Sequence, residues 1–218
     1  MTVAMDGPAG CGKSTIARML SERAGFTCIN SGSLYRAIAY AALGAGIGID
    51  DSEALIRLAR GLDLGVDEDG SVLLSGSKLG RELRSAEVDA VVAQVSAVPE
   101  LRKIVNGIVR TAACGRDVVV EGRDMTTVVF PDAEVRFYID ASIEERARRR
   151  FAEGSSGLDY GLILENIRMR DEIDKGKRVG ALKIAPGVLY LDTSGLTIER
   201  VYEIVYSQIL HVREAHGE

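Results

Sequence analysis

Short apolar runs alternate along the chain with segments in which apolar residues recur every three or four positions. The runs predict strands and the recurrences predict amphipathic helices. Five strands are predicted, at 2–5, 26–29, 118–120, 135–140 and 189–192. Helices are predicted at 13–24, 34–43, 52–61 and 162–174, from Ser142 onward, and along a final segment whose apolar face carries Ile198, Val201, Val205, Ile209 and Val212. This alternation indicates an α/β fold with a parallel sheet covered by helices on both faces.

The pattern changes at Leu62. Two short predicted strands, 62–66 and 71–74, flank an Asp-Gly turn signal at Asp69-Gly70, and a helix-rich stretch follows to Ala113. We therefore predict two domains, a core formed by 1–61 and 114–218 and an inserted domain at 62–113. The Gly/Ser segment 154–157 predicts a loop.

A glycine-rich segment after the first strand carries the clearest chemistry. Residues 7–14, Gly-Pro-Ala-Gly-Cys-Gly-Lys-Ser, match the pattern G-x-x-x-x-G-K-[ST] between a predicted strand and a predicted helix. Backbone N–H groups of such a loop surround phosphate oxygens, Lys13 can reach the β- and γ-phosphates, and Ser14 can ligate Mg²⁺. The predicted ATP-binding residues are Gly7, Pro8, Ala9, Gly10, Cys11, Gly12, Lys13, Ser14 and Thr15. The motif predicts a nucleotide site with ATP and Mg²⁺ but leaves the reaction open.

Composition narrows the class of partner. The 218 residues carry 27 Lys plus Arg against 32 Asp plus Glu, a net charge of −5, so a diffuse basic surface for nucleic acid or an anionic membrane is not expected. No apolar run approaches the roughly 20 residues that span a bilayer, and the first residues lack a signal-peptide pattern. Three scattered cysteines and two histidines near the C-terminus give no metal or triad signature. We expect a cytoplasmic monomer that binds small molecules.

The acidity is local. Residues 50–100 hold 11 acidic and 5 basic residues. A phosphate site must therefore be assembled from individual basic residues elsewhere in the chain.

Polar residues follow two further predicted strands, as Asn30–Arg36 and as Glu121-Gly122-Arg123-Asp124. Ser31 could cap the next helix, Glu121 could join a Mg²⁺ shell, and Arg123 with Asp124 could equally form a structural ion pair. A GTPase would need a guanine-reading Asn-Lys-x-Asp, which the sequence lacks, and a motor or helicase would need more residues. Arginines at strand ends are typical of phosphoryl transfer between two anionic substrates.

Four segments together resemble the bacterial cytidylate kinases, which are nucleoside monophosphate kinases of the P-loop superfamily. They read DGPAGCGKST, NSGSLYRA, EGRDMTTVVFPDA followed by YIDASIEERARRR, and Arg170-Asp171-x-x-Asp174. The resemblance covers nearly the whole chain. It implies a P-loop kinase fold with a five-stranded parallel sheet, an inserted monophosphate-binding domain, and a lid at about 150–180.

The resemblance also implies residue roles. Arg36, Arg123 and Arg170 would hold the acceptor phosphate, Arg102 and Asp124 would approach the cytosine, and Asp174 would meet the ribose hydroxyls. The arginines of 146–150 lead into the lid, where they could reach the transferring phosphate. The implied catalytic residues are Lys13, Arg123 and Arg170. The implied substrate-binding residues are Ser31, Tyr35, Arg36, Arg102, Arg123, Asp124, Arg170, Asp174 and Lys177.

Three positions depart from the family pattern. Lys177 stands where an arginine is usual, with Arg178 beside it. Thr126 replaces a glycine, which would matter if the backbone there needed a positive φ. Ala93 aligns with a serine that helps to read the base, and Ser96 lies about one helical turn away.

The expected reaction is ATP-dependent phosphorylation of CMP and dCMP to the diphosphate. Asp124 can accept a hydrogen bond from the cytosine amine but would repel the uracil carbonyl, a mismatch of about 2–4 kcal/mol. Two alternatives stay open: a kinase for another small acceptor, such as UMP, AMP or a shikimate-like compound, and a P-loop nucleotide-binding switch.

Overall fold

The computed structural model describes residues 1–154 and 158–217, and it contains two compact units. The core unit comprises 1–28 and 116–218, and the second unit comprises 29–115. Of the loop predicted at 154–157, residues 155–157 lie outside the described part. None of the helices in the described part is both long enough and apolar enough to cross a membrane.

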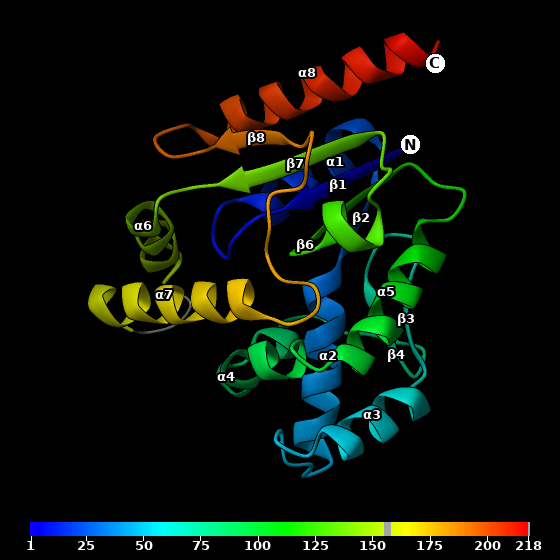
Figure 1. Ribbon diagram of the computed structural model, residues 1–218, viewed down its shortest axis with the longest axis vertical. Coiled ribbons are helices and arrows are strands. Elements are labelled where there is room, and N and C mark those ends of the chain that lie inside the picture. Colours follow the sequence, from blue (N-terminus) through cyan, green and yellow to red (C-terminus); the bar gives the residue numbers. More distant parts are fainter. Residues whose placement is uncertain (155–157, 218) are drawn as a thin grey trace. The chain divides into compact units, whose positions relative to one another are not determined.

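The core unit is built on a five-stranded sheet with the strand order β2-β6-β1-β7-β8 (Figure 1). The strands are β1 (Thr2–Asp6), β2 (Thr27–Asn30), β6 (Val118–Gly122), β7 (Val135–Asp140) and β8 (Leu189–Asp192). β1 pairs in parallel with both β6 and β7, with Val3 opposite Val119 on one side and Val135 on the other, and β7 pairs in parallel with β8. The predicted α/β class and five-stranded parallel sheet are confirmed.

Alternation along the strands decides which side chains enter the main core. Val3 and Met5 of β1 and Phe137 and Ile139 of β7 belong to one buried cluster, because every second residue points to the same face. That cluster also contains apolar residues of α1 (Lys13–Ala24) and α8 (Ile198–His216), which pack against each other. The apolar faces predicted for the two helices are therefore the surfaces that they bury in this cluster.

Helix ends in the core unit follow local rules. α1 ends at Gly25, where φ is 74° and the backbone N–H reaches the Ser21 carbonyl. The Ser142 hydroxyl accepts the Glu145 N–H at 3.1 Å at the start of α6 (Ile143–Glu153), the helix predicted from Ser142 onward. The unit is completed by α7 (Tyr160–Gly176) and by a π-helical turn, η2 (Met125–Val129).

The second unit combines helices with a small antiparallel sheet in the order β3-β4-β5. Its strands are β3 (Leu64–Val66), β4 (Val72–Leu74) and β5 (Ser77–Lys78), and its helices are α2 (Ser31–Gly44), α3 (Ser52–Gly61), η1 (Arg81–Arg84), α4 (Ala86–Val95) and α5 (Pro99–Ala113). The Asp-Gly signal forms the β3–β4 turn, with Gly70 at φ 85°. β5 has only two residues and no predicted counterpart.

The second unit is longer than the predicted insert, because α2 packs against α3, α4 and α5. It starts at Ile29, whereas the insert was predicted to start at Leu62. The packing units do not define functional domains, so the insert at 62–113 and the lid stay predictions.

Candidate active site

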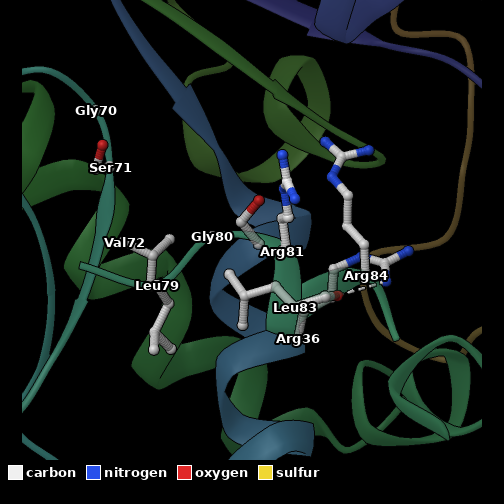
Figure 2. Close-up of a pocket in the computed structure, with 10 residues that line it drawn as sticks. Arg36, Gly70, Ser71, Val72, Leu79, Gly80, Arg81, Leu83 and Arg84 are labelled. Carbon is white, nitrogen blue, oxygen red and sulfur yellow. Dashed lines mark hydrogen bonds between the residues drawn. The ribbon is translucent and has the colours of Figure 1, made fainter. Parts of the chain in front are cut away.

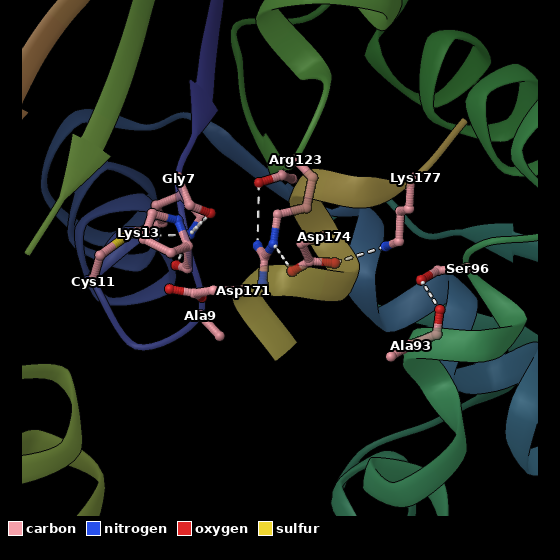
Figure 3. Close-up of polar contacts among 12 residues, drawn as sticks. Gly7, Ala9, Cys11, Lys13, Ala93, Ser96, Arg123, Asp171, Asp174 and Lys177 are labelled. Atoms are coloured by element: carbon pink, nitrogen blue, oxygen red, sulfur yellow. Dashed lines mark hydrogen bonds and ion pairs between the residues drawn. The ribbon is translucent and has the colours of Figure 1, made fainter. Parts of the chain in front are cut away.

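The phosphate loop connects β1 to α1, at the carboxyl end of a central parallel strand. Gly7 has φ 149°, and a Cβ there would stand 1.9 Å from the Ile139 carbonyl oxygen, so only glycine fits. Gly12 precedes the helix with φ 101°. Lys13 is buried, and its Nζ donates to the carbonyl oxygens of Gly7 at 2.8 Å and Pro8 at 2.7 Å (Figure 3). These two hydrogen bonds hold the Lys13 ammonium group inside the phosphate loop.

Two arginines of α6 hold the loop backbone. Arg146 donates to the Ala9 carbonyl at 3.2 Å and makes a two-pronged pair with Asp171 at 3.1 and 2.6 Å. Arg149 donates to the Cys11 carbonyl at 3.3 Å and to the Thr193 carbonyl at 2.8 Å. The sequence suggested that this arginine segment could reach the transferring phosphate, whereas in the structure these two guanidinium groups bind the protein.

Asp171 and Thr193 had no predicted role. Asp171 is buried, and the Thr193 hydroxyl donates to the Cys11 carbonyl at 3.2 Å. The i, i+3 spacing of Asp171 and Asp174 on a helix places both carboxylates on one face, which is the signal that could have indicated a buried role. Thr193 follows the last strand and carries no comparable signal. Cys11, within the phosphate loop, is fully buried.

A second cation cluster joins the end of β6 to the end of α7. Asp174 accepts from Arg123 Nε at 2.7 Å through one carboxylate oxygen and from Lys177 Nζ at 2.7 Å through the other (Figure 3). Burial acts to raise the pKa of Asp174, but the charges of Arg123 and Lys177 outweigh it and hold this pKa below its ordinary value. Lys177, the departure from the family arginine, is thus part of the cluster. Arg170, half-buried, lies on the same helix as Asp174.

The turn after Arg123 and Asp124 is fixed by Asp6, the last residue of β1. The Asp6 carboxylate accepts the backbone N–H groups of Met125 at 2.8 Å and Thr126 at 2.7 Å, and the Thr126 hydroxyl at 2.6 Å. Burial raises the pKa of Asp6, and these donors act in the opposite direction. Thr126 does not adopt a positive φ, so its replacement of glycine causes no strain.

Asp124 itself is almost fully buried. Glu121, at the end of β6, is also buried, and burial together with the Glu121 charge raises the pKa of the Cys28 thiol to about 12. The contacts of Asp6 could not be predicted from the sequence. The sequence shows only that this carboxylate stands between an apolar strand and the phosphate loop.

The remaining predicted site residues lie in the second unit. The Asn30 side chain, not Ser31, caps α2 by accepting the Ser33 N–H at 3.1 Å, so the predicted cap was one residue too late. Arg36 donates to the Leu83 carbonyl at 2.9 Å and pairs with Asp89 at 2.5 Å. It lines a pocket of about 360 Å³ in this unit (Figure 2).

Arg102 lies against Tyr35 and the end of α4. Its guanidinium carbon is 5.5 Å from the centre of the Tyr35 ring, and its NH1 donates to the Ser96 carbonyl at 2.9 Å. The Ser96 hydroxyl donates to the Ala93 carbonyl at 3.0 Å (Figure 3). Arg102 is therefore oriented by Tyr35 and by Ser96, the residue that the sequence singled out beside the Ala93 departure.

The donor set suits Mg²⁺ carried by a nucleotide. Mg²⁺ usually takes one or two protein oxygens and completes its shell with phosphate oxygens and water. Ser14 supplies an exposed hydroxyl in the first turn of α1. Within 1–154 and 158–217, no group of three or more His, Cys, Asp or Glu could hold a metal ion, so the fit rests on Ser14 and the nucleotide.

A glycine-rich phosphate loop between a parallel strand and a helix defines a P-loop nucleotide-binding protein. Arg123, at the end of the neighbouring strand β6, is an arginine placed as phosphoryl transfer requires. The cytidylate kinase family model matches residues 3–211, so the chain belongs to the cytidylate kinase family.

Proteins with the same family name match this chain over more than nine-tenths of its length. The cytidylate kinase of Caldanaerobacter subterraneus is 41% identical over 210 residues, which are 95% of this chain and 93% of the relative. That of Vibrio cholerae is 41% identical over 207 residues, 92% of each chain. The crystal structure of an uncharacterized protein from Eubacterium ventriosum is similar in fold, with a TM-score of 0.54 at 12% identity, covering 96% of this chain and 98% of the other.

Proposed function

We propose that the protein transfers the γ-phosphoryl group of ATP to CMP and dCMP. The observation that carries this proposal is the match to the cytidylate kinase family over residues 3–211. The phosphate loop supports it, because the loop carries every residue of the P-loop pattern. The reaction would take place in the cytoplasm, on small-molecule substrates, and the protein would be a monomer.

The chemistry requires alignment more than proton transfer. An oxygen of the acceptor phosphate attacks the γ-phosphorus, the bond to the β–γ bridging oxygen breaks, and ADP leaves. The acceptor phosphate is already anionic at pH 7, so no histidine base is needed. Mg²⁺, bound between Ser14 and the nucleotide, would neutralise phosphate charge.

Lys13 would stabilise charge that develops on the transferring group. Its two carbonyl contacts place the ammonium inside the loop, so little side-chain ordering is needed when phosphate binds.

Arg36, Arg123 and Arg170 would hold the acceptor phosphate with guanidinium forks. Of these, Arg123 is oriented by Asp174, whose second carboxylate oxygen is held by Lys177. Asp174 would thus keep Arg123 in place. The family resemblance also gives Asp174 a contact with the ribose hydroxyls.

Base selection would rest on Asp124 and Arg102. A buried carboxylate accepts from the exocyclic amine of cytosine and repels the carbonyl of uracil, which favours CMP by about 2–4 kcal/mol. Ser31 and Tyr35 would complete the substrate contacts from the second unit.

A coupled assay of ADP release with CMP, dCMP, UMP and AMP tests the proposal. We expect turnover with CMP and dCMP and much lower rates with UMP and AMP. Comparable rates with all four acceptors would reject the cytosine preference. ADP release that does not depend on any acceptor would instead indicate a nucleotide-hydrolysing switch.

A further inference from the structure

The pocket beside Arg36 carries more positive charge than one arginine supplies. It is lined by the guanidinium-bearing side chains of Arg36, Arg81 and Arg84 and by Ser33 and Ser71 (Figure 2). Every residue of 29–115 is described, and no acidic side chain lines the pocket. Two of the three arginines, Arg81 and Arg84, belong to the stretch 50–100, which holds 11 acidic residues against 5 basic ones.

Backbone geometry explains why two of these arginines act together. Arg81 and Arg84 are the first and last residues of η1, a 3₁₀ turn. Such a turn has three residues per turn, so side chains at i and i+3 project in the same direction. Figure 2 shows both side chains extending to the same side of η1.

The carboxylates near η1 are already engaged. Glu82 accepts the Gly80 N–H at 2.9 Å, and Asp89 pairs with Arg36 at 2.5 Å. Within 1–154 and 158–217, neither Arg81 nor Arg84 forms an ion pair or donates a side-chain hydrogen bond, and both are exposed. Two adjacent guanidinium groups without a protein anion repel each other, and an external anion would relieve that repulsion.

Arg36 fixes this arrangement. Its NH1 donates to the carbonyl of Leu83, which lies between Arg81 and Arg84 in η1. The turn is thereby tied to α2, so the two unpaired arginines are held beside the third. The open forks of Arg81 and Arg84 are suited to a phosphate dianion, which accepts several such hydrogen bonds, and Arg36 adds its charge beside them while it stays paired with Asp89.

We propose that Arg81 and Arg84 form, with Arg36, a three-arginine site for the phosphate of the nucleoside monophosphate. The inference rests on the proposed function and extends it by assigning two phosphate-binding residues beyond Arg36, Arg123 and Arg170.

The test is the double variant Arg81→Ala/Arg84→Ala, compared with Arg60→Ala as a matched control. Arg60 is an exposed arginine of the same unit that does not line the pocket. Calorimetric titration with CMP in the absence of ATP gives Kd, and steady-state assays give the KM for CMP and for ATP. Cytidine, which lacks the phosphate, is measured as a competitive inhibitor, and circular dichroism checks the fold.

We expect the double variant to raise the Kd and KM for CMP about tenfold or more, with the KM for ATP and the inhibition constant of cytidine within about twofold of wild type. Arg60→Ala should match wild type. The Kd and KM for CMP of Arg81→Lys/Arg84→Lys should lie between those of wild type and the double alanine variant. Lysine keeps the charge but lacks the planar fork of donors.

An unchanged Kd for CMP in the double variant would overturn the inference while leaving the proposed function intact. Equal weakening of cytidine and CMP would also overturn it, since the effect would not depend on the phosphate. A wild-type protein that does not turn over CMP would reject the proposed function. In that case titration with inorganic phosphate decides the inference, and equal affinity in wild type and double variant would reject it.

Discussion

The protein uses arginine in two ways. In the core unit, Arg146 and Arg123 are paired with buried carboxylates, Asp171 and Asp174. In the second unit, Arg36 is likewise paired, with Asp89, whereas Arg81 and Arg84 face a pocket without a carboxylate partner in the described part of the chain. Pairing fixes the position of an arginine, as at Arg36 and Arg123, whereas an arginine without a protein anion has all of its donors available to a ligand. The four predictions that follow test the core unit, and the Arg81 and Arg84 variants described above test the second unit.

The largest effect is expected from Lys13→Ala. Loss of the ammonium group removes charge stabilisation from the transferring phosphate, so turnover should fall about a thousandfold or more. The thermal midpoint should change little, because within the described part of the chain the Lys13 ammonium group donates to two carbonyl groups of its own loop and to the Cys11 sulfur. ADP release and a melting curve on the same sample measure both. Retained turnover would remove Lys13 from the chemistry.

Arg146→Ala should be the most destabilising arginine substitution. It leaves Asp171 charged, buried and unpaired, which costs about 3–5 kcal/mol of unfolding free energy. Arg148→Ala on the same helix is the control, since Arg148 is exposed and its pair with Glu145 should contribute less than about 1 kcal/mol. Urea denaturation of both variants measures the difference. Similar losses would contradict the bracing role of Arg146.

Asp174→Asn should lower stability by about 2–3 kcal/mol at neutral pH, because Arg123 and Lys177 lose their shared anion. The pKa of Asp174 lies below its unfolded value of 3.8, so this contribution is complete above that pH and is lost as the pH falls through the folded pKa. The stability gap between wild type and variant should be equal at pH 7 and pH 5.5 and smaller at pH 3. A gap that widens in acid would contradict the assigned charge state.

Thr126→Val should have the smallest effect of the four, about 1–2 kcal/mol, since it removes one hydrogen bond to the buried Asp6. Because this bond fixes the turn that follows Arg123 and Asp124, the KM for CMP should rise more than the KM for ATP. Thr126→Ser keeps the hydroxyl and should restore both the stability and the KM for CMP. If the serine variant behaves like valine, the loss would come from packing and not from the hydroxyl.

The sequence predicted what depends on local pattern. The phosphate loop, the five core strands and the periodic faces of α1 and α8 follow from spacing and composition, and the structure contains them. The family resemblance then supplied the class of reaction, which the family match confirms.

Contacts between distant segments could not be predicted in the same way. Asp6 meets Thr126 at a separation of 120 residues, and Arg146 meets Ala9 at 137. No periodicity encodes such pairs. The arginine pair of η1 was missed for another reason. Arg81 and Arg84 lie in the stretch 50–100, whose net negative charge gave no indication of a phosphate site.

The central claim is phosphoryl transfer from ATP to CMP, and ³¹P NMR of the protein mixed with ATP, Mg²⁺ and CMP tests it most directly. The account predicts that CDP and ADP accumulate in equal amounts while inorganic phosphate stays at the background level. Appearance of ADP with inorganic phosphate, and with CMP unchanged, would contradict it.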